Sequence, residues 1–211
     1  MQKNEKWMVL SDYRVIFAQE SLFQLHIMDA YISIKVGLST KAHWYDELRR
    51  CFPEVKNWKY HFHFTTIYMT DFHEDMIGPL DQELGRLFAS HPPVTFTFNK
   101  VDAFDGLNAR KHIVNLTGDG PDTEFMGLIE AIRSVATKFA TKTPVGFIPH
   151  VTLAEIEPNG MSLDEVKRRL AAIHVPTFTL TLSKIERKTR RPNLDGMAGR
   201  MPGDRSWDLK G

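Results

Sequence analysis

Cysteine is almost absent from this sequence, in which Cys51 is the only one. The chain can therefore form no internal disulfide, and a zinc site built from several cysteines is excluded. No apolar run reaches about 18 residues, the length of a membrane-spanning helix. The first residues also lack the basic-then-apolar pattern of a secretion signal. We therefore expect an intracellular, cytoplasmic chain that makes no membrane contact, and we expect a monomer.

An excess of charge of either sign is also lacking, because 27 Lys and Arg residues stand against 26 Asp and Glu residues. A net charge of +1 creates no overall field that attracts nucleic acid or a membrane surface. Any affinity for an anionic ligand must therefore come from a local cluster of residues. The composition, with 42% hydrophobic and 25% charged residues, is ordinary for a globular protein. A length of 211 residues is enough for one domain of one or two lobes.

Strands and helices alternate along most of the chain. Residues 1–30 show no clear pattern, with short strands at 7–10 and 13–17 and a helix at 21–30 as the best interpretation, and we treat them as an N-terminal extension. Hydrophobic periodicity, capping residues and prolines predict the following elements: strand 31–37, helix 39–51, strand 58–70, a helix between 78 and 91, strands 94–98 and 111–116 joined as a hairpin, helix 122–139, strand 150–156, helix 162–173 and strand 175–185.

The strands alternate apolar and polar residues, which favours antiparallel pairing with helices on the outside, and hence an α+β fold. The order strand, helix, strand occurs before residue 70 and again between residues 111 and 156, so the chain has the outline of a duplication. We expect residues 31–211 to form a single domain. Its end, residues 186–211, is basic and rich in Gly and Pro, and we interpret it as a loop with a short strand around Trp207.

Two short motifs stand inside predicted strands: His63-Phe64-Thr65-Thr66 and His150-Val151-Thr152-Leu153. Alternate side chains of a strand point the same way, so each motif presents an imidazole and a hydroxyl about 6–7 Å apart on one surface. Two such strands side by side would present two imidazoles and two hydroxyls to one space. Phosphodiester cleavage needs such a set, with one imidazole to take a proton, one to give a proton, and neutral donors for the phosphate oxygens.

The two motifs and the order of elements resemble the 2H phosphoesterase superfamily, which includes RNA 2′,3′-cyclic phosphodiesterases and ligase-like proteins. The resemblance spans about residues 31–185. It is closer at the second motif, Pro149 to Ala154, because the family usually has an apolar residue where this chain has Thr66. The resemblance implies a two-lobed α+β fold whose mainly antiparallel sheets line a central cleft, with helices outside. It also implies cleavage of cyclic phosphates or related phosphodiesters without a metal or another cofactor.

The same resemblance assigns roles to the motif residues. His63 would give a proton to the leaving ribose oxygen, His150 would take a proton from the attacking water, and Thr65 and Thr152 would bind the non-bridging oxygens. The partner would be a nucleotide or an RNA end that carries a 2′,3′-cyclic phosphate. Two alternatives remain open: a hydrolase of cyclic di- or oligonucleotide signals, including those of antiphage defence, and a nucleotide- or RNA-binding module without turnover.

Residues near the motifs offer further contacts. His61 shares a strand face with His63, and His73 follows, so a metal site competes with the acid–base interpretation; since the sequence places no further ligands, we expect no metal and take His61 as an accessory donor at the rim. Phe147 and Tyr68 are aromatic groups on which a base could stack. Strict alternation, however, puts Tyr68 on the strand face opposite His63, which favours a place in the core.

The basic stretch from Lys184 to Arg205 allows two interpretations. One is a solvated, mobile segment. The other is a flap that steers a polyanionic ligand towards the site.

Overall fold

The computed structural model describes residues 27–106, 109–120, 122–140, 142–143, 146–158, 161–191, 199–200 and 203–210. Its helices in these ranges are α2 (His43–Cys51), the 3-10 turn η1 (Glu74–Met76), α3 (Ile77–Ala89), α4 (Thr123–Ala136) and α5 (Leu163–Leu170). Its strands are β1 (Ile27–Val36), β2 (Phe62–His73), β3 (Val94–Phe98), β4 (Lys100–Asp105), β5 (His112–Thr117), β6 (Val151–Ile156), β7 (Phe178–Leu182), β8 (Lys184–Arg191), β9 (Gly199–Arg200) and β10 (Arg205–Asp208). None of these helices combines the length and the apolar character that crossing a membrane requires.

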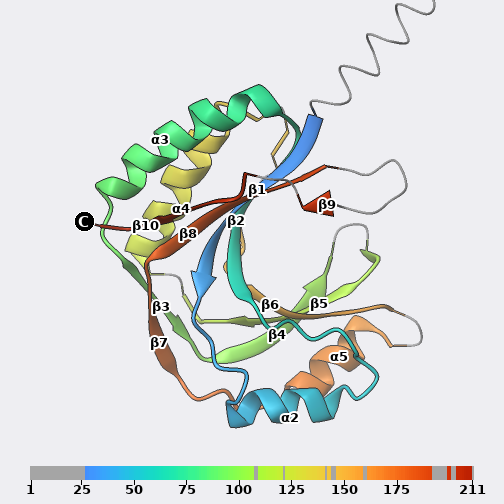
Figure 1. Ribbon diagram of the computed structural model, residues 1–211. Coiled ribbons are helices and arrows are strands. Elements are labelled where there is room, and N and C mark those ends of the chain that lie inside the picture. Colours follow the sequence, from blue (N-terminus) through green and yellow to red (C-terminus); the bar gives the residue numbers. More distant parts are fainter. Residues whose placement is uncertain are drawn as a thin grey trace, which may run out of the picture.

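One large sheet organises the molecule, with the strand order β10-β8-β1-β2-β6-β5-β4 and with β9 beside β8. Strands β3 and β7 form a second, two-stranded sheet, and the strand pairs of both sheets are antiparallel. Figure 1 shows that the half with β8, β1 and β2 lies beside α3 and α4, whereas the half with β6, β5 and β4 lies above α2 and α5. This arrangement confirms the predicted α+β fold with mainly antiparallel strands and external helices.

The two halves of the large sheet meet between β2 and β6, where the register consists of one Cα pair, Phe64 with Val151. Both side chains are fully buried. The ring of Phe64 lies 4.8 Å from that of Phe96, 5.0 Å from that of Phe125 and 5.7 Å from that of Phe98, measured between centroids. Aromatic pairs of this kind contribute about 0.5–1.5 kcal/mol each beyond their burial. The centre of the aromatic core therefore lies directly behind the junction of the two halves.

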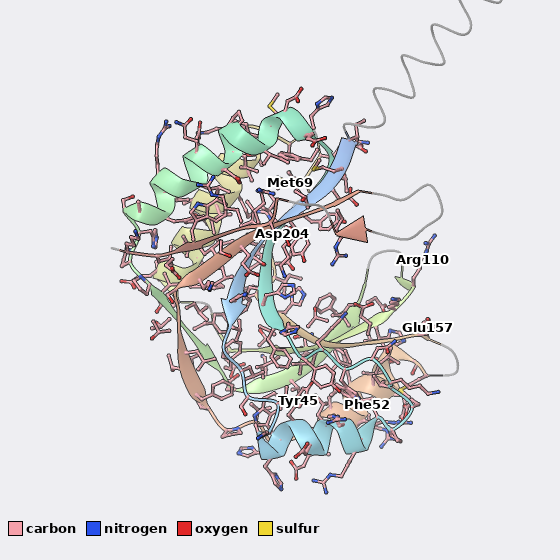
Figure 2. The ribbon with its side chains drawn as sticks, in the orientation of Figure 1. Tyr45, Phe52, Met69, Arg110, Glu157 and Asp204 are labelled. Atoms are coloured by element: carbon pink, nitrogen blue, oxygen red, sulfur yellow. The ribbon has the colours of Figure 1, made fainter. Side chains whose placement is uncertain are left out.

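The segment that enters β2 is fixed on two sides. The Tyr45 hydroxyl, from α2, donates a hydrogen bond of 2.8 Å to the Lys59 carbonyl, and the Lys59 amide donates one of 2.9 Å to the Leu153 carbonyl. Burial raises the pKa of Tyr45 to about 12, so this donor keeps its proton. Figure 2 labels Tyr45 and Phe52, which lie on the α2 side of the sheet.

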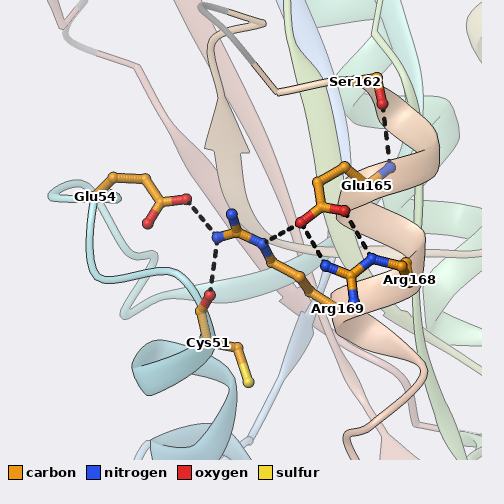
Figure 3. A network of polar contacts seen from close by, with 6 residues as sticks. All are labelled: Cys51, Glu54, Ser162, Glu165, Arg168 and Arg169. Atoms are coloured by element: carbon orange, nitrogen blue, oxygen red, sulfur yellow. Dashed lines mark hydrogen bonds and ion pairs between the residues drawn. The ribbon is translucent and has the colours of Figure 1, made fainter.

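Helix α5 is joined to the end of α2 by the polar network of Figure 3. Ser162 Oγ accepts a hydrogen bond of 3.2 Å from the Glu165 amide and caps the helix at the residue where the predicted helix 162–173 begins. Hydrogen bonds from Arg168 and Arg169 lower the pKa of Glu165 to about 2. Arg169 also donates to the Cys51 carbonyl over 3.3 Å. The helix is thereby anchored under the β6-β5-β4 half.

The predicted hairpin of strands 94–98 and 111–116 is wrong, since β3 pairs with β7 and β5 pairs with β4. The predicted turn at Asp105-Gly106 is present but joins β4 to β5, with the Gly106 amide bonded to the Lys111 carbonyl. Strand β4 was not predicted because its alternation is short: Val101 and Ala103 alternate with Lys100 and Asp102, but Phe104 then breaks the pattern. At the end of β5, a Cβ on Gly118 would lie 2.0 Å from the Thr97 carbonyl oxygen, so glycine is required for the backbones to pass.

The C-terminal region differs most from its prediction. The strand predicted at 175–185 is divided between β7 and β8, and the loop or mobile segment expected after Glu186 is wrong as far as Arg191, because β8 pairs with β1 along this stretch. The strand predicted around Trp207 is confirmed as β10. At the other end, β1 begins at Ile27, so residues 27–30 are strand instead of helix; residues 1–26 lie outside the described residues.

Strand β8 is held in the sheet by a buried ion pair. The Arg187 guanidinium, 1% exposed, donates to the Asp81 carboxylate of α3 over 2.6 and 3.0 Å and to the Gly203 carbonyl over 2.5 Å. A charged residue in a strand is ordinarily expected to face solvent. The partner that allows the burial of Arg187 is remote in the chain, so local sequence patterns do not predict it.

Candidate active site

The four motif side chains lie on one face of the large sheet. Phe64 and Val151 point into the core, and neighbouring residues in a strand point to the opposite face. Continuing the antiparallel pairing by one residue in each direction therefore puts His63 opposite Thr152, and Thr65 opposite His150. We call this surface the motif face.

The two imidazoles occupy diagonal positions on the motif face. Diagonal neighbours on paired strands have Cβ atoms about 7–8 Å apart, a separation that rings can bridge to a shared group. His63 lies within β2, and His150 directly precedes β6. Both are half-buried, so each is shielded from bulk water but still accessible.

Each ring is oriented by the backbone two residues before it. His150 Nδ1 lies 2.8 Å from the Ile148 carbonyl oxygen, and the His63 ring bonds the backbone of His61. A carbonyl only accepts, so Nδ1 of His150 carries the hydrogen and Nε2 remains an acceptor in the neutral ring. The bond from His63 favours its protonated form, which means that this ring is also the donor. Each imidazole thus keeps one nitrogen for a ligand.

Burial lowers the pKa of both histidines below the ordinary 6.5, so both rings are mostly neutral at pH 7. For His63, the Lys188 cation lowers the pKa further, while the bond to His61 and the Glu186 carboxylate act in the opposite direction. For His150, the hydrogen bond to Ile148 is the opposing influence. The two rings are therefore both partly desolvated but differ in their charged surroundings.

The hydroxyls of Thr65 and Thr152 are half-buried and make no hydrogen bond within the described residues. They are free to donate to a ligand. Thr66 differs, since its buried hydroxyl donates to the Ile32 carbonyl over 2.9 Å. The polar residue that stands where the family has an apolar one is thus satisfied within the sheet.

A β-bulge at Thr66 changes which residues share the motif face. Ser33 pairs with Thr65, but the preceding residue, Ile32, pairs with Ile67. Thr66 is therefore an extra residue in β2, and the alternation of faces is reversed beyond it.

The reversal brings Tyr68 onto the motif face, opposite Tyr31. The prediction that Tyr68 lies on the face opposite His63 is therefore wrong. The ring centroid of Tyr31 lies 6.1 Å from that of His63 and 6.2 Å from that of Tyr68, in stacked geometry. The Tyr68 hydroxyl donates to the Asp29 carboxylate over 2.9 Å, and burial together with this bond raises its pKa to about 12.

The other predicted contacts lie apart from this row of rings. The Phe147 ring is half-buried, 6.3 Å from the Phe125 ring of the core, and His61 is exposed. Phe104, which the sequence did not identify, meets the His150 ring edge-on at 4.9 Å between centroids. It lies on β4, and without knowledge of that strand nothing in the sequence links it to the second motif.

Lysines surround two carboxylates near the motif residues. Glu186 lies 2.6 Å from Lys35 and 3.4 Å from Lys188, and Glu155 lies 2.9 Å from Lys59 and 2.7 Å from Lys111. Within the described ranges, no group of three or more His, Cys, Asp or Glu residues is arranged to hold a metal ion.

Comparison with known proteins assigns a family. Residues 38–191 match the sequence model of the 2′-5′ RNA ligase superfamily. No curated protein matches the sequence.

Solved structures share the fold. Escherichia coli LigT complexed with 3′-AMP has a TM-score of 0.55 at 17% identity, over 88% of this chain and 99% of LigT. TT0787 of Thermus thermophilus has a TM-score of 0.59 at 14% identity, over 87% of this chain and 99% of its own. Kluyveromyces marxianus Usb1 with uridine monophosphate has a TM-score of 0.55 at 10% identity, over 86% of this chain and 98% of Usb1. At these identities the similarity supports the fold alone.

Proposed function

Because the chain belongs to the 2′-5′ RNA ligase superfamily of 2H phosphoesterases, we propose that it hydrolyses a 2′,3′-cyclic phosphate on a nucleotide or an RNA end. One observation carries the proposal. Two half-buried imidazoles, each with a nitrogen available, and two hydroxyls without a partner among the described residues surround a single Cα pair. Structures of LigT with 3′-AMP and of Usb1 with uridine monophosphate support a nucleotide ligand.

The reaction needs an acid and a base on opposite sides of the phosphorus. His150 takes a proton from the attacking water, and His63 gives one to the leaving ribose oxygen as the P–O bond breaks. Thr65 and Thr152 donate hydrogen bonds to the non-bridging oxygens, where negative charge gathers in the transition state.

The environment of His63 suits the role of the acid. The nearby Lys188 lowers its pKa, and a lower pKa makes the imidazolium a stronger acid towards the leaving oxygen. The bound phosphate has the opposite effect on both rings, because an anion favours the charged form. Substrate binding thus favours the uptake from solvent of the proton that the acid later gives to the leaving oxygen.

The test is turnover of adenosine 2′,3′-cyclic phosphate, and of an RNA oligonucleotide ending in that group, with EDTA present throughout. The wild-type protein should form product, and His63→Gln and His150→Gln should each lower kcat by about 10²–10⁴-fold. His43→Gln is the matched control, because His43 is 80% exposed at the start of α2. Circular dichroism should show that all three variants are folded.

Other outcomes contradict the proposal in distinct ways. Saturable binding without product in the wild-type protein identifies a binding module. Activity that EDTA abolishes and a divalent cation restores identifies metal-dependent chemistry. Near-normal rates in either motif variant remove that histidine from the mechanism.

A further inference from the structure

The two sides of the motif face differ in chemistry. Beside His150 lie the Phe104 ring, 4.9 Å away, and Ile148, which is 67% exposed. Beside His63, in contrast, lie the basic residues of β8, next to β1 in the sheet (Figure 1). The first side suits an apolar or aromatic group, and the second suits an anion.

Alternate residues of β8 reach the motif face. Arg187 is buried on the core side with Asp81, so its neighbours point the other way. The register places Lys188 beside Tyr31, and Arg190 beside Asp29, one strand away from β2. The basic stretch identified in the sequence is therefore fixed in the sheet at this point.

Arg190 is held in place but keeps its charge available. Its guanidinium carbon lies 5.3 Å from the centroid of the Tyr31 ring, whose other neighbour is the ring of His63. In the part of the chain that the structure describes, no carboxylate forms an ion pair with Arg190. Asp29, its neighbour across the strands, already accepts the Tyr68 hydroxyl.

The positive charge of Lys188 is at most partly neutralised by a nearby carboxylate. Glu186 lies 3.4 Å from its ammonium group but 2.6 Å from that of Lys35, so the carboxylate is shared and favours Lys35. The positive charge of Lys188 lowers the pKa of His63. The cation is therefore close to the place where the first phosphate would bind.

We infer that Lys188 and Arg190 form a second anion-binding subsite, which takes a further phosphate of the same nucleotide or RNA strand. The inference rests on the proposed function and narrows it, since a substrate with one phosphate would leave this subsite empty. Charge complementarity is the reason: two preorganised cations, whose charge the described residues do not fully neutralise, stand beside a site for phosphate. The preferred substrate then carries at least two phosphates.

Binding measurements test the subsite without requiring turnover. Calorimetry compares adenosine 3′-phosphate with adenosine 3′,5′-bisphosphate, and a diadenylate ending in a 3′-phosphate with its analogue whose internal linkage is a neutral methylphosphonate. In at least one of the two wild-type pairs, the second charged phosphate should tighten Kd about tenfold. The pair that shows the gain identifies a 5′-phosphate or an internucleotide phosphate as the ligand. The slope of log Kd against log salt should also be steeper by about 0.7 for each phosphate contact.

Arg190→Gln and Lys188→Gln should each reduce the gain from the second phosphate, whereas Arg86→Gln should keep it. Arg86 is exposed on α3, which packs against the opposite side of the sheet, so it is a matched control. Equal affinity within each wild-type pair, or an undiminished gain in both β8 variants, would overturn the subsite. A gain without hydrolysis of any cyclic phosphate would keep the subsite and refute the proposed function.

Discussion

Replacing Asp81 by asparagine would leave Arg187 charged and buried without a counter-charge. The two side chains are 7% and 1% exposed, and their contacts of 2.6 and 3.0 Å form a bidentate pair. Removing one partner of such a pair costs about 3–5 kcal/mol of unfolding free energy, because the remaining charge cannot be solvated. For a chain of 211 residues, about 2–4 °C of melting temperature accompanies each kcal/mol, so the expected loss is about 6–20 °C.

A thermal melt followed by circular dichroism measures this loss, and Glu83→Gln provides the comparison. Glu83 lies on the same helix and pairs with Lys138 at 2.8 Å, but both side chains are exposed enough for water to replace the contact. Exposed pairs contribute about 0–1 kcal/mol, so this variant should melt within a few degrees of the wild-type protein.

The double variant Asp81→Leu with Arg187→Met completes the test, since it removes both charges and keeps apolar volume. It should recover most of the stability that Asp81→Asn loses, as replacing a buried pair by apolar residues is often neutral. The assigned role of this pair is refuted if Asp81→Asn has the same melting temperature as Glu83→Gln. It is also refuted if the double variant melts at a lower temperature than Asp81→Asn.

Three further outcomes are expected. Burial lowers the pKa of both His63 and His150, so kcat/KM should be highest below pH 6.5. It should fall from there towards pH 8, because the acid loses its proton, and a maximum above pH 7 would contradict this. Lys188→Met should move the limb of the kcat/KM profile that belongs to His63 to higher pH and leave the other limb in place, and two limbs that move together would refute the assignment. Phe64→Ala should lower the unfolding free energy by about 3–5 kcal/mol in urea titrations, and a loss below about 1 kcal/mol would show that the aromatic cluster has little role.

The motif residues could be predicted because their information is local. Period-2 alternation puts His63 and Thr65 on one side of a strand, and the same rule holds for His150 and Thr152. The pairing of the two strands is not local, but it was implied by a family resemblance that the matched residues 38–191 support.

Features set by register could not be predicted in the same way. A bulge adds one residue to β2 and moves Tyr68 to the other face of the strand. The residues around Thr66 do not identify this bulge from the sequence alone. Phe104 reaches His150 only through a short strand, and the hydrophobic alternation of that strand breaks at Phe104 itself. The position of Arg190 depends on the burial of Arg187, and that depends on an aspartate in a distant helix.

The pairing of β2 with β6 is one Cα pair long, and it joins the half of the sheet that carries His63 to the half that carries His150. Since main-chain pairing between the halves is so short, side-chain packing carries much of the contact that holds one half against the other. The spacing between the two motif imidazoles therefore depends on the aromatic rings packed around Phe64 on the core side of the sheet. Residues that lie in the core, away from any ligand, would in this way set the distance between the two proposed catalytic groups.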